Sequence, residues 1–187
     1  MSYRNANYCA FYVDETVNGW NLGANAAHDL CYYRQLQAWK AADPSFPFID
    51  AHVKTYSVRD DSDWEETLKP RLHKRLMKSK NIILFLSSIT RDSRALHEEI
   101  EYGMVTLGLP VIVVYPDIKD ESDIVSDGKN LSLYVASLWD TLPIFRDHKK
   151  DVPVLHIPYK KNFIRSALQD EDFMINTKIE SGDYILQ

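Results

Sequence analysis

The sequence predicts an α/β protein built on a doubly wound parallel sheet. Residues 81–86 and 109–115 are short, continuously apolar runs, which is the pattern of strands buried on both faces. A segment with helical spacing of apolar residues separates them, and the same alternation continues on either side. Strands that alternate with helices are typical of a parallel sheet covered on both faces.

The N-terminal quarter of the chain is expected to hold a strand, a loop and a helix. Residues 8–13 form an apolar run that Asp14 ends, and we expect a central strand there. Residues 26–42 predict a helix because apolar side chains recur at a spacing of three. The segment 43–47, which contains two prolines, ends that helix.

The next segment is expected to hold the second strand, the second helix and the third strand. We place the second strand at residues 51–56. Leucines at a spacing of four predict the following helix, which begins near Thr67 or Leu68 so that Pro70 falls in its first turn. The apolar run 81–86 is then the third strand.

The second half of the chain continues the alternation beyond the fourth strand, 109–115. Pro153 indicates an edge position for the fifth strand, because proline cannot donate a ladder hydrogen bond. Five strands joined by right-handed crossovers fit a flavodoxin-like sheet with the order 2-1-3-4-5. We assign residues 1–168 to one domain and 169–187 to a C-terminal tail that either docks or frays. In order, we expect an acidic loop, a helix, the fifth strand and a last helix at residues 116–130, 131–142, 152–157 and 159–168.

The composition is that of a globular protein and excludes several partners. The chain has 187 residues, 45% of them hydrophobic, and a net charge of −5, so electrostatics gives no reason to expect nucleic acid or an anionic membrane. No apolar run reaches the length of a membrane span, and the N-terminus lacks a signal-peptide pattern, so we expect a cytoplasmic protein. Cys9 and Cys31 lie in apolar or helical patterns and are expected to be buried reduced thiols.

Several other α/β functions lack their motifs. The chain has no Gly-x-Gly-x-x-Gly for a dinucleotide fold and no Gly-x-Ser-x-Gly for an α/β-hydrolase. A response-regulator receiver domain needs an aspartate after the third strand, where this chain has Ser87 and Ser88. None of the histidines has the spacing of a metal site, so no metal is expected.

Serines follow the third strand at the place where open parallel sheets bind ligands. Ser87 and Ser88 come directly after the apolar run, and ligands bind outside the carboxyl ends of such strands. Their hydroxyl groups can donate hydrogen bonds to a bound ligand. The sequence therefore predicts a ligand edge at this turn and at the helix that follows it.

That helix carries one carboxylate with space beside it. Glu99 lies at the border of the apolar stripe, with Ala95 one turn before it and Gly103 one turn after it. The two small neighbours leave room for a ligand next to the carboxylate. The spacing alone also fits a solvated acidic face near a helix N-terminus. Since successive residues turn by about 100°, the stripe that faces the sheet consists of Leu96, Ile100, Met104 and Leu107.

A basic stretch, residues 69–80, accompanies the leucines of the second helix. The periodicity predicts that its charges form a solvated helix face. The alternative is contact with an acidic partner surface, such as residues 117–123 of another copy of the chain. The basic side chains are Lys69, Arg71, His73, Lys74, Arg75, Lys78 and Lys80.

Together these patterns resemble a TIR domain, in particular the TIR-like branch typified by the Thoeris antiphage protein ThsB. The first-strand pattern, residues 11–14, also fits, and the resemblance covers residues 8–115. The matching segments are the stretch before the third strand, the Ser/Thr-rich turn, the Glu-Ile pair on the helix and the Gly-x-x-Val-Ile entry into the fourth strand: residues 78–81, 87–93, 99–100 and 108–112.

The resemblance implies cleavage of the nicotinamide–ribose bond of NAD+, which is the substrate, so that no cofactor is required. Some members of the family then cyclise the ADP-ribose into a signal for an effector protein. The catalytic glutamate of the family corresponds to Glu99, and loops 12–20 and 56–64 line the cleft. The family usually has an aromatic residue where this chain has Ala95, so Trp20 or Trp64 would supply the stacking wall. The candidate substrate-binding residues are Tyr12, Asp14, Trp20, Ser87, Ser88, Ala95 and Gly103.

A lone carboxylate suits this chemistry. The departing nicotinamide leaves an oxocarbenium-like ribosyl centre, whose positive charge a carboxylate stabilises. The first hypothesis is therefore an NAD+ hydrolase or cyclase in bacterial antiphage signalling, acting alone or as a homo-oligomer. The alternative is a non-catalytic TIR-like module that binds a nucleotide or assembles with partner proteins.

Overall fold

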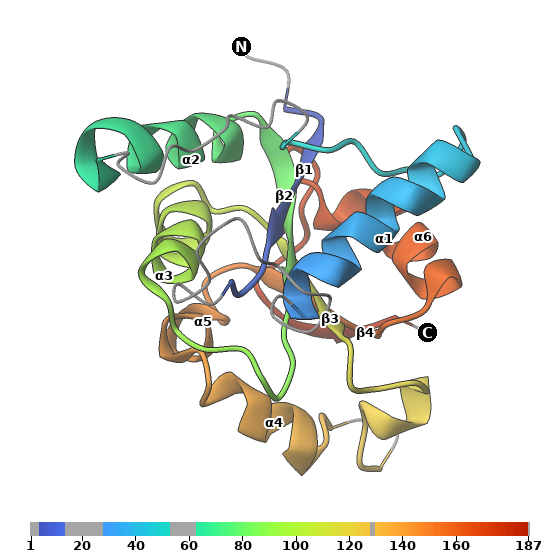
Figure 1. The fold of residues 1–187 in the computed structure, drawn as a ribbon. Coiled ribbons are helices and arrows are strands. Elements are labelled where there is room, and N and C mark those ends of the chain that lie inside the picture. Colours follow the sequence, from blue (N-terminus) through green and yellow to red (C-terminus); the bar gives the residue numbers. More distant parts are fainter. Residues whose placement is uncertain (1–3, 14–27, 53–62, 128–129, 187) are drawn as a thin grey trace.

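The protein has a central sheet of five parallel strands, shown in the computed structural model of Figure 1. The structure describes residues 4–13, 28–52, 63–127 and 130–186. The apolar runs of the sequence form the strands, and nearly every residue of the first four is buried. In sheet order the strands are β1 (Ala6–Ala10), β2 (Ser79–Phe85), β3 (Val111–Tyr115), β4 (Pro153–Pro158) and β5 (Gly182–Ile185).

Helices cover both faces of the sheet, which confirms the predicted α/β class. Strand residues alternate between two cores: Ile82 and Leu84 of β2 face one, and Ile83 and Phe85 face the other. The first core is closed by α2 (Lys69–Leu76), α3 (Arg94–Ile100), α4 (Leu133–Trp139) and α5 (Pro143–His148). The second is closed by α1 (His28–Ala42) and α6 (Lys161–Gln169) (Figure 1).

The strand order differs in part from the predicted 2-1-3-4-5. At the outer edge of β1, Asp50 makes only an isolated parallel bridge to Asn7. The Asn7 backbone N–H donates to the Ile49 carbonyl at 2.6 Å, and its carbonyl accepts from the Ala51 N–H at 3.1 Å. Ala51 and His52 lie in a turn, and the rest of the predicted second strand lies outside the described residues.

The C-terminal tail supplies the strand at the opposite edge. β5 pairs in parallel with β4, and Pro153 of β4 lies opposite Gly182. β4 is therefore an inner strand, and the edge position predicted from Pro153 is wrong. Proline is tolerated there because it is the first residue of its strand, where a missing N–H breaks no regular ladder.

The helix α2 begins close to the predicted residue, Thr67 or Leu68. α2 is preceded by a π-helical turn, Trp64–Leu68, and has Pro70 in its first turn. α3 begins after Ser93, whose side chain accepts from the Leu96 N–H at 3.3 Å, and it continues as a π-helical turn, Glu101–Thr106. The predicted apolar stripe of α3 faces the core.

One prediction for the cysteines is wrong. Cys9 is buried in β1, whereas Cys31 is exposed. In α1 the buried positions are Asp29, Tyr33 and Leu36, and Cys31 lies off that stripe on the outer side of the helix. None of the helices in the described part of the chain has the length and apolar character needed to cross a membrane.

Candidate functional site

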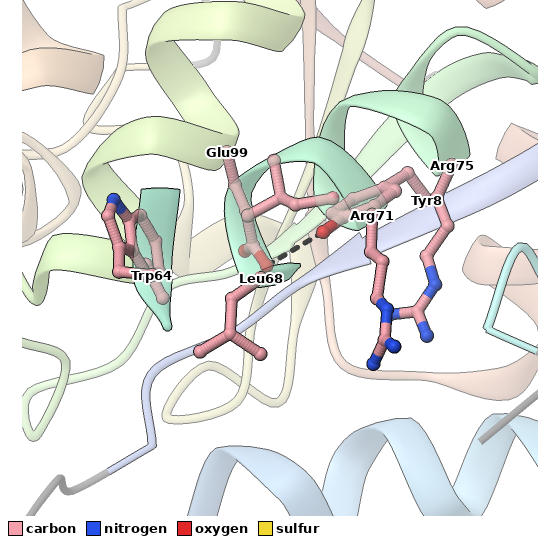
Figure 2. Close-up of a pocket in the computed structure, with 8 residues that line it drawn as sticks. Tyr8, Trp64, Leu68, Arg71, Arg75 and Glu99 are labelled. Atoms are coloured by element: carbon pink, nitrogen blue, oxygen red, sulfur yellow. Dashed lines mark hydrogen bonds between the residues drawn. The ribbon is translucent and has the colours of Figure 1, made fainter. Parts of the chain in front are cut away.

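A pocket of about 180 Å³ lies where α2 and α3 meet β1 (Figure 2). Tyr8 comes from β1, whereas Ala95 and Glu99 come from α3. The remaining lining side chains come from α2 and from the π-helical turn before it: Trp64, Leu68, Arg71, Leu72 and Arg75.

Polar contacts beside the pocket hold α2 against α3. The Glu98 carboxylate pairs with Lys69 Nζ at 3.1 Å and with His73 Nε2 at 2.6 Å. The His73 ring also stacks on Tyr102, with 3.5 Å between the ring centroids. Glu98 thus fixes the two helices to each other. The next residue, Glu99, points to β1 because it lies about 100° further around the helix.

Glu99 is the acidic group of the pocket. Its Oε1 accepts a hydrogen bond of 2.7 Å from the Tyr8 hydroxyl, drawn as a dashed line in Figure 2. Burial raises the pKa of Glu99 to about 8, although the Tyr8 hydrogen bond and the charge of Arg75 act in the opposite direction. A carboxyl group with a pKa near neutrality can exist in both protonation states under physiological conditions.

Tyr8 is fixed as the donor of this pair. Its side chain is only 1% exposed. Burial first, and then the neighbouring Glu99, raise the pKa of Tyr8 well above its usual value, so the phenol keeps its proton. The hydroxyl therefore donates to Glu99 and orients the carboxyl group in the pocket.

Trp64 supplies an aromatic wall beside Ala95. The Arg94 guanidinium lies 4.6 Å from the centre of the Trp64 ring, and Arg94 Nη2 donates to Glu65 Oε1 at 2.9 Å. The indole is thus held between its helix turn and the start of α3. Ala95, whose position we expected to be compensated by Trp20 or Trp64, lines the same pocket as Trp64.

Two arginines of α2 form the basic part of the pocket. Arg75 Nη1 lies 3.4 Å from His52 Nδ1, and His52 Nε2 lies 3.1 Å from the Cys9 carbonyl oxygen. Burial, aided by the charge of Arg75, lowers the pKa of His52 to about 4. The ring is therefore neutral, with Nε2–H donating to Cys9 and Nδ1 accepting from Arg75.

The predicted serines belong to a different cluster, at the carboxyl end of β2. The Ser87 hydroxyl donates to Asp29 Oδ1 at 3.2 Å, and the Thr90 hydroxyl donates to Asp29 Oδ2 at the same distance. Burial raises the pKa of Asp29 to about 6. Ser88 is exposed, and its backbone N–H donates to Asp117 at 2.7 Å. Neither serine lines the pocket of Glu99.

Of the other predicted residues that the structure describes, Ala95 lines the pocket, whereas Gly103 and Tyr12 are not among its lining residues. A Cβ atom on Gly103 would lie 2.4 Å from Ile82 Cδ1, so protein fills the space that was expected to admit a ligand there. Tyr12 is partly buried against the core on the α2–α3 face. Asp14 and Trp20 lie outside the described residues.

Sequence reasoning did not single out Tyr8 or the arginines. Tyr8 was hidden in the apolar run of β1, where nothing in the pattern marks its hydroxyl. Arg71 and Arg75 were interpreted as part of a solvated face, although their spacing of four places them on one side of α2. Within the described residues, no three His, Cys, Asp or Glu side chains come together in a way that could hold a metal ion.

A comparison with known protein families places part of the chain in a family. The family model of the TIR-like domain of the Thoeris protein ThsB matches residues 8–121, more than half of the chain. The matched segment runs from β1 through β3 and contains every residue that lines the pocket. The elements from α4 to β5 lie beyond it.

Proposed function

The chain belongs to the TIR-like domain family of the Thoeris protein ThsB, which gives it a part in antiphage defence signalling, and we propose that it acts there by cleaving NAD+. The bond broken is the one between nicotinamide and ribose. Glu99 is the proposed catalytic residue, and the product is ADP-ribose or a cyclic isomer that signals to an effector protein.

The observation that carries this proposal is a desolvated carboxyl group beside an aromatic wall. Glu99 and Trp64 line the same pocket, and the hydroxyl of Tyr8 in β1 orients the Glu99 carboxyl group. A planar nicotinamide ring can stack on an indole, while a carboxylate stabilises positive charge on the ribose. An electrostatic interaction of this kind is stronger in a pocket than in water.

The raised pKa of Glu99 fits a cationic substrate. The free carboxyl is mostly neutral at pH 7 because its pKa is about 8. A positive charge brought within about 4–6 Å favours the ionised form and lowers the pKa. Binding of the nicotinamide cation would thus generate the carboxylate that the transition state requires.

The test is nicotinamide release from NAD+ by the purified protein at high concentration, followed by liquid chromatography. Glu99→Gln keeps the shape of the side chain and should reduce the rate by at least about 100-fold, since it removes the charge that stabilises the transition state. Glu101→Gln is the matched control, because Glu101 is exposed on the same helix and does not line the pocket. Equal release by wild type and Glu99→Gln would contradict the proposal.

The same pKa supports a second candidate function, a non-catalytic module. A carboxyl group that stays neutral and hydrogen-bonded to Tyr8 would belong to a binding site and would not act as a catalyst. This candidate predicts that NAD+ binds in calorimetry with no nicotinamide released. If nicotinamide is released, chromatography of the second product separates ADP-ribose from a cyclic isomer.

A further inference from the structure

We propose that Arg71 and Arg75 form a phosphate-binding pair that holds the pyrophosphate of a nicotinamide dinucleotide. This inference rests on the proposed function and names the class of substrate that the pocket takes. It requires a phosphorylated nicotinamide nucleotide and excludes the phosphate-free nucleoside part alone as the preferred ligand.

The first argument is the position of the two guanidinium groups. Arg71 and Arg75 are four residues apart on α2, so they lie one turn apart on the same side of the helix. Both line the pocket of Glu99, and Figure 2 shows their side chains extending from α2 in the same direction. Two guanidinium groups placed in this way can bind oxygens of the same phosphate-containing anion.

The second argument is that Arg75 is held in place. His52 accepts from Arg75 at 3.4 Å, and the Cys9 carbonyl fixes the tautomer of His52 from the other side. The Ser79 hydroxyl donates to the backbone carbonyl of Arg75 at 2.9 Å, which anchors the last turn of α2. A guanidinium restrained in this way loses less conformational entropy when it binds a ligand.

The third argument is charge complementarity along the pocket. In Figure 2, Trp64 lies on one side of the Glu99 carboxyl group and the two arginines lie on the other. NAD+ has the matching arrangement, with a cationic nicotinamide at one end of its ribose and a doubly charged pyrophosphate at the other. Arginine is suited to this role because its planar fork binds phosphate oxygens in pairs.

The size of the pocket indicates how much of the ligand it covers. Sites that enclose a whole small molecule measure about 300–1,000 Å³, whereas this pocket measures about 180 Å³. It is therefore too small to enclose the whole dinucleotide, and the proposed arrangement places the pyrophosphate at its rim. The contacts of the two arginines with the phosphates would then make the pocket bind nucleotides more tightly than nucleosides.

The experiment measures binding of ADP, which carries the pyrophosphate but cannot be cleaved at a nicotinamide bond. Calorimetry compares wild type with Arg71→Gln, Arg75→Gln and the double variant. Lys74→Gln is the matched control, because it removes the same charge from an exposed position of α2 outside the pocket. We expect the double variant to bind ADP at least tenfold more weakly and Lys74→Gln to stay within twofold of wild type.

A second pair of variants tests whether a loss of ADP binding comes from misfolding. Arg71→Lys and Arg75→Lys keep the charge but lose the paired hydrogen bonds, so affinity for ADP should fall between that of wild type and that of the glutamine variants. Nicotinamide riboside should bind equally to all of these proteins, because it has no phosphate. ADP affinity that is unchanged in every arginine variant would overturn the inference.

The outcomes separate this inference from the proposed activity. Arginine-dependent ADP binding without any nicotinamide release would support the phosphate site and contradict the NAD+ glycohydrolase. If nicotinamide is released while the double variant keeps its ADP affinity and its KM for NAD+, the glycohydrolase is supported and the phosphate site is contradicted. If both proposals hold, the double variant raises KM for NAD+ at least tenfold and changes kcat much less.

Discussion

The Glu99 carboxyl group is held in surroundings that favour its neutral form. Its pKa is about 8 in the folded protein, against a usual value of 4.5. Between these values the folded chain binds a proton that the unfolded chain has released. The stability that comes from this proton is fully present below about pH 4.5 and is lost as the pH rises through about 8.

The first prediction compares wild type with Glu99→Gln between pH 5 and pH 8. Glutamine cannot ionise, so the free energy of unfolding of wild type should fall relative to the variant by up to about 1.4 kcal/mol per pH unit. Urea denaturation at each pH measures the difference, and Glu101→Gln should run parallel to wild type. If the free energy of unfolding changed with pH equally in wild type and Glu99→Gln, the pKa of Glu99 would not be raised by burial in the folded protein.

At the same scale, spacing along a helix identified some pocket residues but not their partners. The position of Glu99 beside Ala95 followed from the period of α3. The donor, Tyr8, is 91 residues away in sequence from Glu99, and its contact depends on how β1 packs against α3. Ser87 satisfied the expectation for a strand end, yet its hydroxyl is taken by Asp29 of α1. Pairings of this kind depend on tertiary packing.

Among the elements, the π-helical turn that continues α3 approaches the sheet closely because it carries a glycine. The second prediction concerns Gly103→Ala, whose Cβ would lie 2.4 Å from Ile82 Cδ1 and 3.3 Å from Leu76 Cδ2. Ile82 is fully buried and has little space to move. The overpacking should outweigh the gain in helix propensity and lower the free energy of unfolding by about 1–2 kcal/mol.

Ile82→Val provides the test of that mechanism, because it removes the methyl group that the new Cβ would strike. By itself it should cost about 1 kcal/mol through the cavity it leaves. Combined with Gly103→Ala it should cost less than the sum of the two single variants, as measured by urea denaturation. Additive losses would show that the close contact with Ile82 is not the cause.

The strands and helices that were predicted well are those with a single strong pattern. β2, β3 and the stripe of α3 follow directly from apolar runs or from a period of 3.6 residues. The position of β4 in the sheet did not follow, because Pro153 satisfies the rule for a first strand residue as well as the rule for an edge. The next strand, β5, was not predicted because it is only four residues long, GDYI.

For the molecule as a whole, a chain of polar contacts, buried except at Asp183, connects β3, β4 and β5. Trp139 Nε1 donates to the Tyr115 hydroxyl at 3.1 Å, which bonds to His156 Nδ1 at 2.7 Å. His156 Nε2 donates to Asp183 Oδ1 at 2.9 Å, and Lys149 pairs with the other oxygen of Asp183. Tyr115 and His156 have no exposed surface. β5 is thus attached to the sheet by side chains as well as by its backbone.

The chain of hydrogen bonds from Trp139 to Asp183 depends on the ionised carboxylate of Asp183. Burial opposes its ionisation, but the hydrogen bonds from His156 and Lys149 outweigh that effect and lower its pKa. The carboxylate therefore persists at neutral pH, and its stabilising effect would be lost only as the pH falls through the lowered pKa. Removing it leaves the buried Nε2–H of His156 and the ammonium of Lys149 without their partner.

The third prediction follows from that arrangement. Asp183→Ala should lower the free energy of unfolding by about 3 kcal/mol, because a buried cation then lacks its counter-charge. Asp151→Ala is the control, since Asp151 pairs with His148 at the surface and should cost at most about 1 kcal/mol. Hydrogen exchange should also locate the damage: the amides of Tyr184 and Ile185 in β5 should exchange faster relative to that of Ile83 in β2. If protection in β5 were unchanged, the backbone pairing with β4 alone would hold the C-terminal strand, and the polar chain would contribute only to the core around His156.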